Sequence, residues 1–136
     1  MGLFSKENKA GQGDLNNLPC HVAVIMDGNG RWAKQHRLNV AMGHRQGTET
    51  LREIIRHTDD LKIEALSIYA FSTENWKRSK EEVGALMQLF RFYAKRLLAM
   101  AEKNNIRVRM IGERNRFAPD LVEAINGLEE KTKNNT

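Results

Sequence analysis

Runs of apolar residues mark the strands that the sequence predicts. Residues 21–26 are His followed by Val, Ala, Val, Ile and Met, a pattern typical of a strand buried on both faces. A second, largely apolar run over 63–71 predicts another strand. Residues 106–111 alternate apolar side chains with two arginines and end at Gly112, which predicts a third strand.

Helical periodicity fills the intervals between these runs. Residues 45–59 carry apolar side chains on one face and predict a helix. Ser79 followed by Glu82 is a capping box, and it opens a long helix that we expect to run to about Asn104. A last helix is expected over 119–131, because Pro is a favourable first helical residue. The main apolar stripe of the long helix comprises Val83, Leu86, Met87, Phe90, Ala94, Leu97 and Ala101.

Strands that alternate with helices of this length predict βαβ units, and therefore an α/β fold with a parallel sheet. The 136 residues suit one domain better than two. Residues 1–18 are rich in Gly, Asn and Lys with little periodicity, and we interpret them as a flexible leader. Residues 19–136 then belong to a single domain.

Charge narrows the choice of partners only slightly. Lys and Arg number 22 against 17 Asp and Glu, for a net charge of +5. This balance suits nucleic acid, anionic lipid headgroups or phosphorylated small molecules about equally. No apolar run approaches the ~20 residues of a membrane span, and the N-terminus lacks a signal peptide's apolar core, so a cytoplasmic location is the expectation.

The cysteine count and the histidine spacing argue against a disulfide and against the common zinc sites. Cys20 is the only cysteine, which excludes an intrachain disulfide and a cysteine zinc site, and we expect it to be a small buried thiol at a strand start. The four histidines lack the spacing of a helical zinc motif.

The strongest candidate chemistry follows the first strand. Asp27 comes directly after the apolar run, and Gly28 and Gly30 allow the positive φ angles and close backbone approach of an anion-binding turn. Arg31 adds a guanidinium suited to phosphate, and we expect a helix N-terminus at Gly43-His44 at the same sheet edge. Together these groups predict a magnesium-bound diphosphate. The plainer alternatives are a tight turn, a solvated arginine and a Trp32 that belongs to the core.

A second polar segment, residues 72–78, follows the second strand. It mixes hydroxyls, an amide, an aromatic ring and two cations. One interpretation is an ordinary strand-to-helix loop with a surface tryptophan. The other is a second rim for an anionic substrate with apolar parts.

At these segments the sequence resembles the cis-prenyltransferase (undecaprenyl diphosphate synthase) family. The motifs are residues 21–34 (HVAVIMDGNGRWAK), then Gly43-His44, then residues 69–76 (YAFSTENW), in the family's order and spacing. The similarity extends from about His21 to the end of the chain. It implies repeated condensation of isopentenyl diphosphate onto an allylic primer such as farnesyl diphosphate, with cis double bonds. In bacteria the product is the precursor of the cell-wall lipid carrier.

The resemblance also implies the architecture and partners of the family. Its members are homodimers with a parallel sheet, helices on both faces and a hydrophobic tunnel for the growing chain. It implies Mg²⁺ as cofactor, no nucleic acid, and a cytoplasmic protein that contacts the membrane, if at all, through its lipid product.

Carried over residue by residue, the resemblance implies that Asp27 binds Mg²⁺ and helps the allylic diphosphate to leave. The family treats Asn75 as part of proton removal, but an amide is a negligible base, so we expect it to position the substrate or to relay a proton to a diphosphate oxygen. The implied substrate-binding residues are Gly28, Asn29, Gly30, Arg31, Trp32, His44, Ser72, Thr73, Glu74, Trp76 and Arg78.

Two departures from the family pattern change the expectation. Val40 stands where the family usually has an arginine that contacts diphosphate, and losing such a bond typically costs about 1.5–3 kcal/mol. Family members also run about a hundred residues further, through an Arg-rich motif and a second magnesium carboxylate. We therefore expect the N-terminal part of one cis-prenyltransferase domain. The alternatives are a truncated, weakly active or inactive product, an accessory subunit, and a basic nucleic-acid module.

Overall fold

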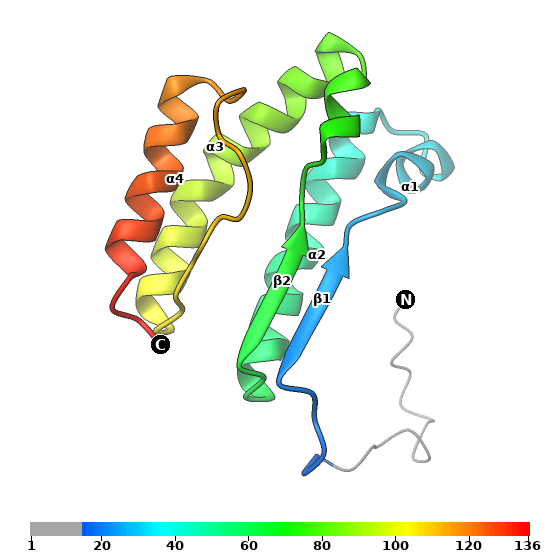
Figure 1. Cartoon of the computed structure of the whole chain (residues 1–136). Coiled ribbons are helices and arrows are strands. Elements are labelled where there is room, and N and C mark those ends of the chain that lie inside the picture. Colours follow the sequence, from blue (N-terminus) through cyan, green and yellow to red (C-terminus); the bar gives the residue numbers. More distant parts are fainter. Residues whose placement is uncertain (1–14) are drawn as a thin grey trace.

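The computed structural model describes residues 15–136, so most of the predicted leader over 1–18 lies outside the described residues. The element order alternates strands and helices and ends in a helical pair (Figure 1). The elements are β1 (His21–Ile25), α1 (Asn29–Gln35), α2 (Val40–Asp60), β2 (Ala65–Tyr69), the 3-10 helix η2 (Thr73–Lys77), α3 (Lys80–Lys103) and α4 (Pro119–Thr132).

The two strands pair in parallel, in register from His21 beside Ala65 to Ile25 beside Tyr69. The crossover between them contains α1 and α2, so the unit is βαβ and the predicted α/β class is confirmed. Because the strands are parallel, the segments that follow them, α1 and η2, emerge at the same sheet edge (Figure 1).

Helix α2 begins at Val40 rather than near Arg45, because Asn39 is a good N-cap. The Asn39 side chain accepts a hydrogen bond from the Met42 amide at 2.9 Å. The prediction that Gly43-His44 is the helix N-terminus is therefore wrong, and His44 lies inside the helix.

Helix α1 was not predicted, since residues 27–32 have the composition of a turn. Gly28 does take a positive φ of 92°, as expected, but it serves as the N-cap of this short helix. Gly30 lies within the first turn and has no positive φ, so that part of the prediction is wrong.

The two helices approach closely at glycines of α2. A Cβ at Gly43 would collide with the carbonyl oxygen of Asn29 and lie 2.9 Å from the Cβ of Ala33. A Cβ at Gly47 would collide with the amide group of the Asn29 side chain. Ala33 is fully buried in this contact. Gly43 faces the backbone of α1, so any side chain there requires the two helices to shift, whereas the Asn29 side chain opposite Gly47 can move aside.

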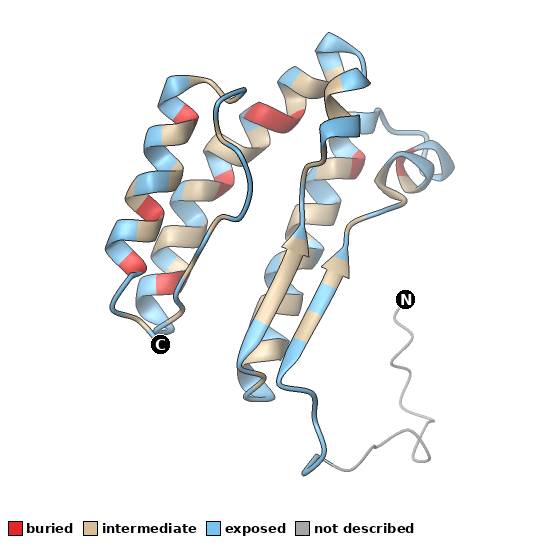
Figure 2. Ribbon diagram, viewed as in Figure 1, coloured by how far each residue is buried: buried red, intermediate tan, exposed pale blue. Residues whose placement is uncertain are grey.

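The buried side chains gather on α3 and α4 and on the α1–α2 contact rather than on the sheet (Figure 2). One face of the strand pair leaves Ile25 and Tyr69 exposed by 75% and 59%. Cys20, expected to be buried, is exposed just before β1. The buried apolar residues are Ala33, Leu86, Met87, Tyr93, Ala101, Leu121 and Leu128.

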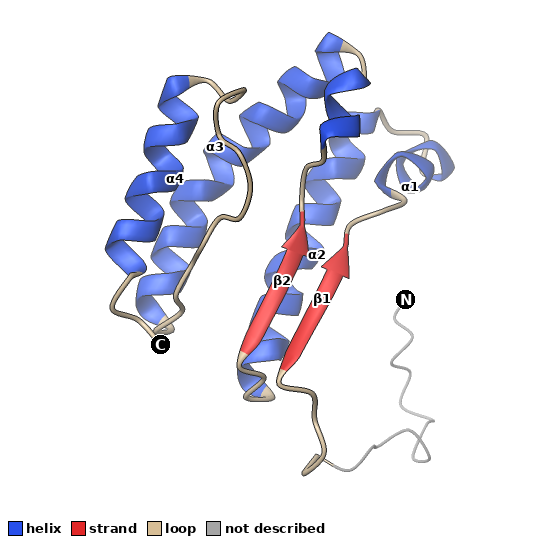
Figure 3. Cartoon of the chain, in the orientation of Figure 1, coloured by secondary structure: helices blue, strands red, loops and turns tan. Residues whose placement is uncertain are grey.

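The predicted third strand over 106–111 is wrong, and the segment is an irregular loop (Figure 3). Helix α4 supplies the partners that a neighbouring strand would have given. The Val108 amide donates to the buried Thr132 hydroxyl at 3.0 Å, and the Met110 amide donates to Glu129 at 2.6 Å. Alternation of side chains is not enough for a strand when its amides bond elsewhere.

We expect Gly43→Ala to lower the free energy of unfolding by about 1–3 kcal/mol, because the new methyl group meets the backbone of α1. Urea titration followed by circular dichroism measures this. Gly84→Ala is the matched control, since Gly84 lies in α3 with open space around it and alanine there should add about 0.5–1 kcal/mol. A Gly43→Ala protein at least as stable as the wild type would contradict the close approach.

We also expect the docking of residues 106–111 on α4 to weaken in acid. The hydrogen bond from the Met110 amide lowers the pKa of Glu129, burial raises it, and Arg114 lowers it further, for a net decrease from 4.5. A carboxyl group with a lower pKa in the folded state stabilises that state fully above about 4.5, and the contribution disappears as pH falls through the folded pKa.

The measurement is the free energy of unfolding of the wild type and Glu129→Gln at pH 7 and at successive steps below about 4.5. The stability advantage of the wild type should shrink over those steps. Glu123→Gln, at an exposed position on the same helix, controls for the change of net charge. A constant difference across the series would show that Glu129 does not carry the effect.

Candidate functional site

The first group of predicted site residues lies where β1 ends. Arg31 Nη2 donates to Asp27 Oδ2 at 3.3 Å, from one side of the Gly28 turn to the other. The side chains are 79% and 77% exposed for Asp27 and Arg31. An exposed pair of this kind contributes only about 0–1 kcal/mol, so both groups can readily rearrange around a charged ligand.

The second group is a chain of polar contacts that starts on α1 and crosses α2. Asn29 Nδ2 lies 3.5 Å from His44 Nδ1, and His44 Nε2 lies 3.1 Å from Glu82 Oε1 on α3. Arg78, which follows η2, donates to the same oxygen of Glu82. The chain therefore links the segment after β1 with the segment after β2.

Most of this polar chain is shielded from solvent. The side chains of His44 and Glu82 are 11% and 19% exposed. Burial raises the pKa of Glu82, but hydrogen bonds from His44 and Arg78 outweigh it, and the net pKa is lowered from 4.5. Glu82 is thus held as a carboxylate between two donors.

The segment after β2 is organised by its own cap. Asn75 Oδ1 accepts from the Ser72 amide at 2.7 Å and from the Ser72 hydroxyl at 3.0 Å, which closes a capping box on η2. Thr73 and Glu74 are exposed on this turn. The side-chain oxygen of Asn75 is therefore engaged locally by Ser72.

The two tryptophans have aromatic neighbours rather than bare surface positions. Trp76 packs edge-on against Phe71 with centroids 4.9 Å apart and lies 5.7 Å from Phe117. The guanidinium of Arg116 covers the Trp76 ring at 4.5 Å. Trp32 stacks on His36 within α1 at 4.1 Å and is half-buried. The interpretation of Trp76 as a surface residue is wrong.

Within residues 15–136, no direct hydrogen bond or ion pair joins Asp27 or Arg31 to residues 72–78. The structure brings Asn29, His44 and Arg78 together, and Ser72 with Asn75. The residue that analysis of the sequence missed is Glu82, which was assigned to a helix cap. Its position four residues after Arg78, which directly precedes the predicted helix, was the available signal.

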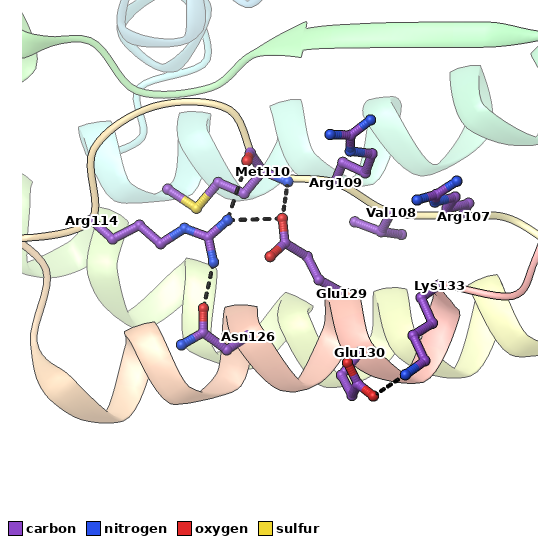
Figure 4. A pocket seen from close by; sticks show the side chains of 9 residues that line it. All are labelled: Arg107, Val108, Arg109, Met110, Arg114, Asn126, Glu129, Glu130 and Lys133. Carbon is purple, nitrogen blue, oxygen red and sulfur yellow. Dashed lines mark hydrogen bonds and ion pairs between the residues drawn. The ribbon is translucent and has the colours of Figure 1, made fainter.

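Neither a cluster of metal ligands nor a pocket marks another candidate site in the described residues. In the described part of the chain, no group of three or more His, Cys, Asp or Glu side chains is arranged to hold a metal ion. A pocket of about 410 Å³ lies between residues 107–114 and α4, and none of its lining residues comes from β1, β2 or the segments that directly follow them (Figure 4). Its Arg114 is already bound by Glu129 and Asn126, so we keep the strand ends as the candidate site.

The helices of residues 15–136 include none that is both long enough and apolar enough to cross a membrane.

Comparison with known proteins identifies the family. The family model described as putative undecaprenyl diphosphate synthase matches residues 25–136. The isoprenyl transferase of Clostridium tetani is 42% identical over 139 residues, which cover 96% of this chain and 54% of that protein. The isoprenyl transferase of Agrobacterium fabrum is 46% identical over 121 residues, covering 89% and 49% respectively.

Comparison with solved structures gives the same family as comparison of sequences. Lavandulyl diphosphate synthase from Lavandula x intermedia, in complex with dimethylallyl diphosphate, superposes with a TM-score of 0.83 at 32% identity, covering 87% of this chain and 51% of that one. A probable undecaprenyl diphosphate synthase from Campylobacter jejuni gives 0.70 at 36% identity, covering 88% and 51%. The chain spans about half the length of the curated relatives it matches. By sequence and by fold, the chain belongs to the undecaprenyl diphosphate synthase family.

Proposed function

We propose that the chain takes part in cis-prenyl transfer, as the binding half for the allylic diphosphate. The overall reaction condenses isopentenyl diphosphate onto farnesyl diphosphate and yields a long cis-polyprenyl diphosphate, the precursor of the bacterial cell-wall lipid carrier. The observation that carries the proposal is the Asp27–Arg31 pair at the end of β1, inside the segment matched by the family model. A carboxylate beside a guanidinium suits a metal-bound diphosphate.

The donor chemistry of Asp27 fits Mg²⁺. Mg²⁺ prefers oxygen ligands, keeps several waters, and is commonly held by one or two carboxylates together with substrate phosphates. Asp27 is exposed, and its pairing with Arg31 uses Oδ2 and leaves Oδ1 for another partner. A bound Mg²⁺ would neutralise charge on the diphosphate as it departs. Asp27 would hold one side of the ion, while Arg31 turns to a phosphate oxygen.

The remaining residues would hold and orient the substrates. Gly28, Asn29 and Gly30 lie at the same turn and would approach the diphosphate through the backbone. Asn75, with its carbonyl oxygen held by Ser72, would orient the substrate through its amide nitrogen instead of removing a proton itself. The other proposed substrate contacts are Trp32, His44, Ser72, Thr73, Glu74, Trp76 and Arg78.

The wider setting is proposed on the same basis. We expect a homodimer of complete domains in the cytoplasm, with peripheral contact with the membrane through the lipid product and without nucleic acid. For residues 1–136 alone we expect binding rather than turnover, because about half the length of the relatives lies outside the match.

We expect wild-type chain to bind farnesyl diphosphate with Mg²⁺, and Asp27→Ala to bind at least about tenfold more weakly, a loss of about 1.4 kcal/mol. Isothermal titration with and without Mg²⁺ measures this. Asp60→Ala is the control, since Asp60 is an exposed aspartate at the far end of α2. Failure of the folded wild type to bind, or equal loss in both variants, would refute the proposal.

We expect Val40→Arg to strengthen binding of farnesyl diphosphate about tenfold. Position 40 lies one helical turn before His44 on α2, so an arginine there shares a face with it, and a charge-assisted hydrogen bond contributes about 1.5–3 kcal/mol. Leu38→Arg, two residues earlier and also exposed, adds the same charge without that alignment. Equal gains in both variants would indicate a general charge effect instead.

A further inference from the structure

Glu82 does not do what its position in a capping box predicts. Ser79, the N-cap of α3, accepts a hydrogen bond from the Glu82 amide at 3.2 Å, which is the first half of the box. The return bond would send the Glu82 carboxylate back to the Ser79 amide. The carboxylate instead reaches His44 on α2, 38 residues earlier in the chain. The Glu82 carboxylate therefore contacts His44 on another helix in place of the Ser79 amide in its own turn.

The contacts of the His44 ring favour one of its two neutral tautomers. Glu82 Oε1 accepts from Arg78 and lies 3.1 Å from His44 Nε2, so a carboxylate there requires the proton on Nε2. On the other side of the ring, Asn29 Nδ2 is a donor 3.5 Å from Nδ1. Both contacts favour the same tautomer, with Nε2 protonated and Nδ1 an acceptor.

The placement connects this histidine to both loops of the candidate site. Asn29 follows Asp27 and Gly28 on the β1 side, and Arg78 ends η2 on the β2 side. With Glu82 accepting from both His44 and Arg78, one carboxylate sets the ring orientation and anchors the second loop. Removing it would free both partners at once.

We propose that Glu82 is a positioning residue for His44 and Arg78. It holds the imidazole with Nε2–H directed at its carboxylate and Nδ1 directed at Asn29, on the side of the diphosphate loop. This inference rests on the proposed function for its effect on substrate, while the ring geometry stands independently of it.

Nuclear magnetic resonance of chain labelled with ¹⁵N-histidine tests the ring geometry, at pH 8.5, where imidazole side chains are ordinarily neutral. We expect a downfield ring proton bonded to Nε2 of His44, assigned by its loss in His44→Gln. It should disappear in Glu82→Leu, which has no acceptor, and persist in Glu82→Gln, which keeps an acceptor oxygen. Glu81→Leu, at the exposed neighbouring position, should leave it unchanged.

Titration with farnesyl diphosphate and Mg²⁺ tests the effect on substrate. We expect Glu82→Leu to weaken binding about tenfold, with partial recovery in Glu82→Gln and no change in Glu81→Leu. If the wild type does not bind, the proposed function fails, while the ring signal still decides the role of Glu82.

Three results would overturn the inference. A wild-type ring proton on Nδ1 would do so even if Glu82→Leu failed to fold. Survival of the Nε2 signal in a folded Glu82→Leu would do so as well. Loss of the signal with unchanged binding, in a chain whose wild type binds, would remove the positioning role for substrate.

Discussion

The close approach of α1 to α2 is the constraint on which the rest of the site depends. Gly43 lets the Asn29 carbonyl and Ala33 lie directly against the α2 backbone, and Gly47 admits the Asn29 side chain. A larger residue at Gly43 would push against the α1 backbone and displace the Asp27–Arg31 turn with it, because α1 begins two residues after Asp27. The same contact brings Asn29 to His44. A pair of glycines on one helix thereby sets where a carboxylate, a guanidinium and an imidazole lie.

His44 is in turn held against α3 by its contact with the half-buried carboxylate of Glu82. Shielding strengthens each contact and makes an unmatched group costly, about 1–3 kcal/mol for a buried donor or acceptor left without a partner. The lowered pKa of Glu82 reflects that balance, since hydrogen bonds from His44 and Arg78 overcome the effect of burial. The segments after the two strands are thus linked through Glu82, although within residues 15–136 no hydrogen bond or ion pair joins Asp27 or Arg31 to residues 72–78.

The sequence predicted the long, regular elements well and failed where distant residues decide. Strands β1 and β2 and helices α3 and α4 have apolar patterns that need no tertiary information. Helix α1 lacks such a pattern and forms because Gly43 accepts it. Residues 106–111 have a strand's alternation, yet Thr132 and Glu129 take their amides. Likewise the contact of His44 with Glu82 was not predictable, because the Ser79–Glu82 capping-box pattern accounts for Glu82 locally.

The two halves of the site differ in how firmly they are held, and the difference suits a charged ligand. The exposed Asp27–Arg31 pair contributes about 0–1 kcal/mol, so a metal-bound diphosphate can separate it at little cost and recover both groups as contacts. His44 and Glu82 are shielded, and both His44 and Arg78 bond to the Glu82 carboxylate, so moving these groups would leave donors or an acceptor unmatched. A side chain that is already ordered loses little conformational entropy when a ligand binds, whereas a weakly held ion pair can rearrange around the ligand. If the proposed function holds, the firm half would orient the substrate, and the adaptable half would exchange its internal contact for the ligand.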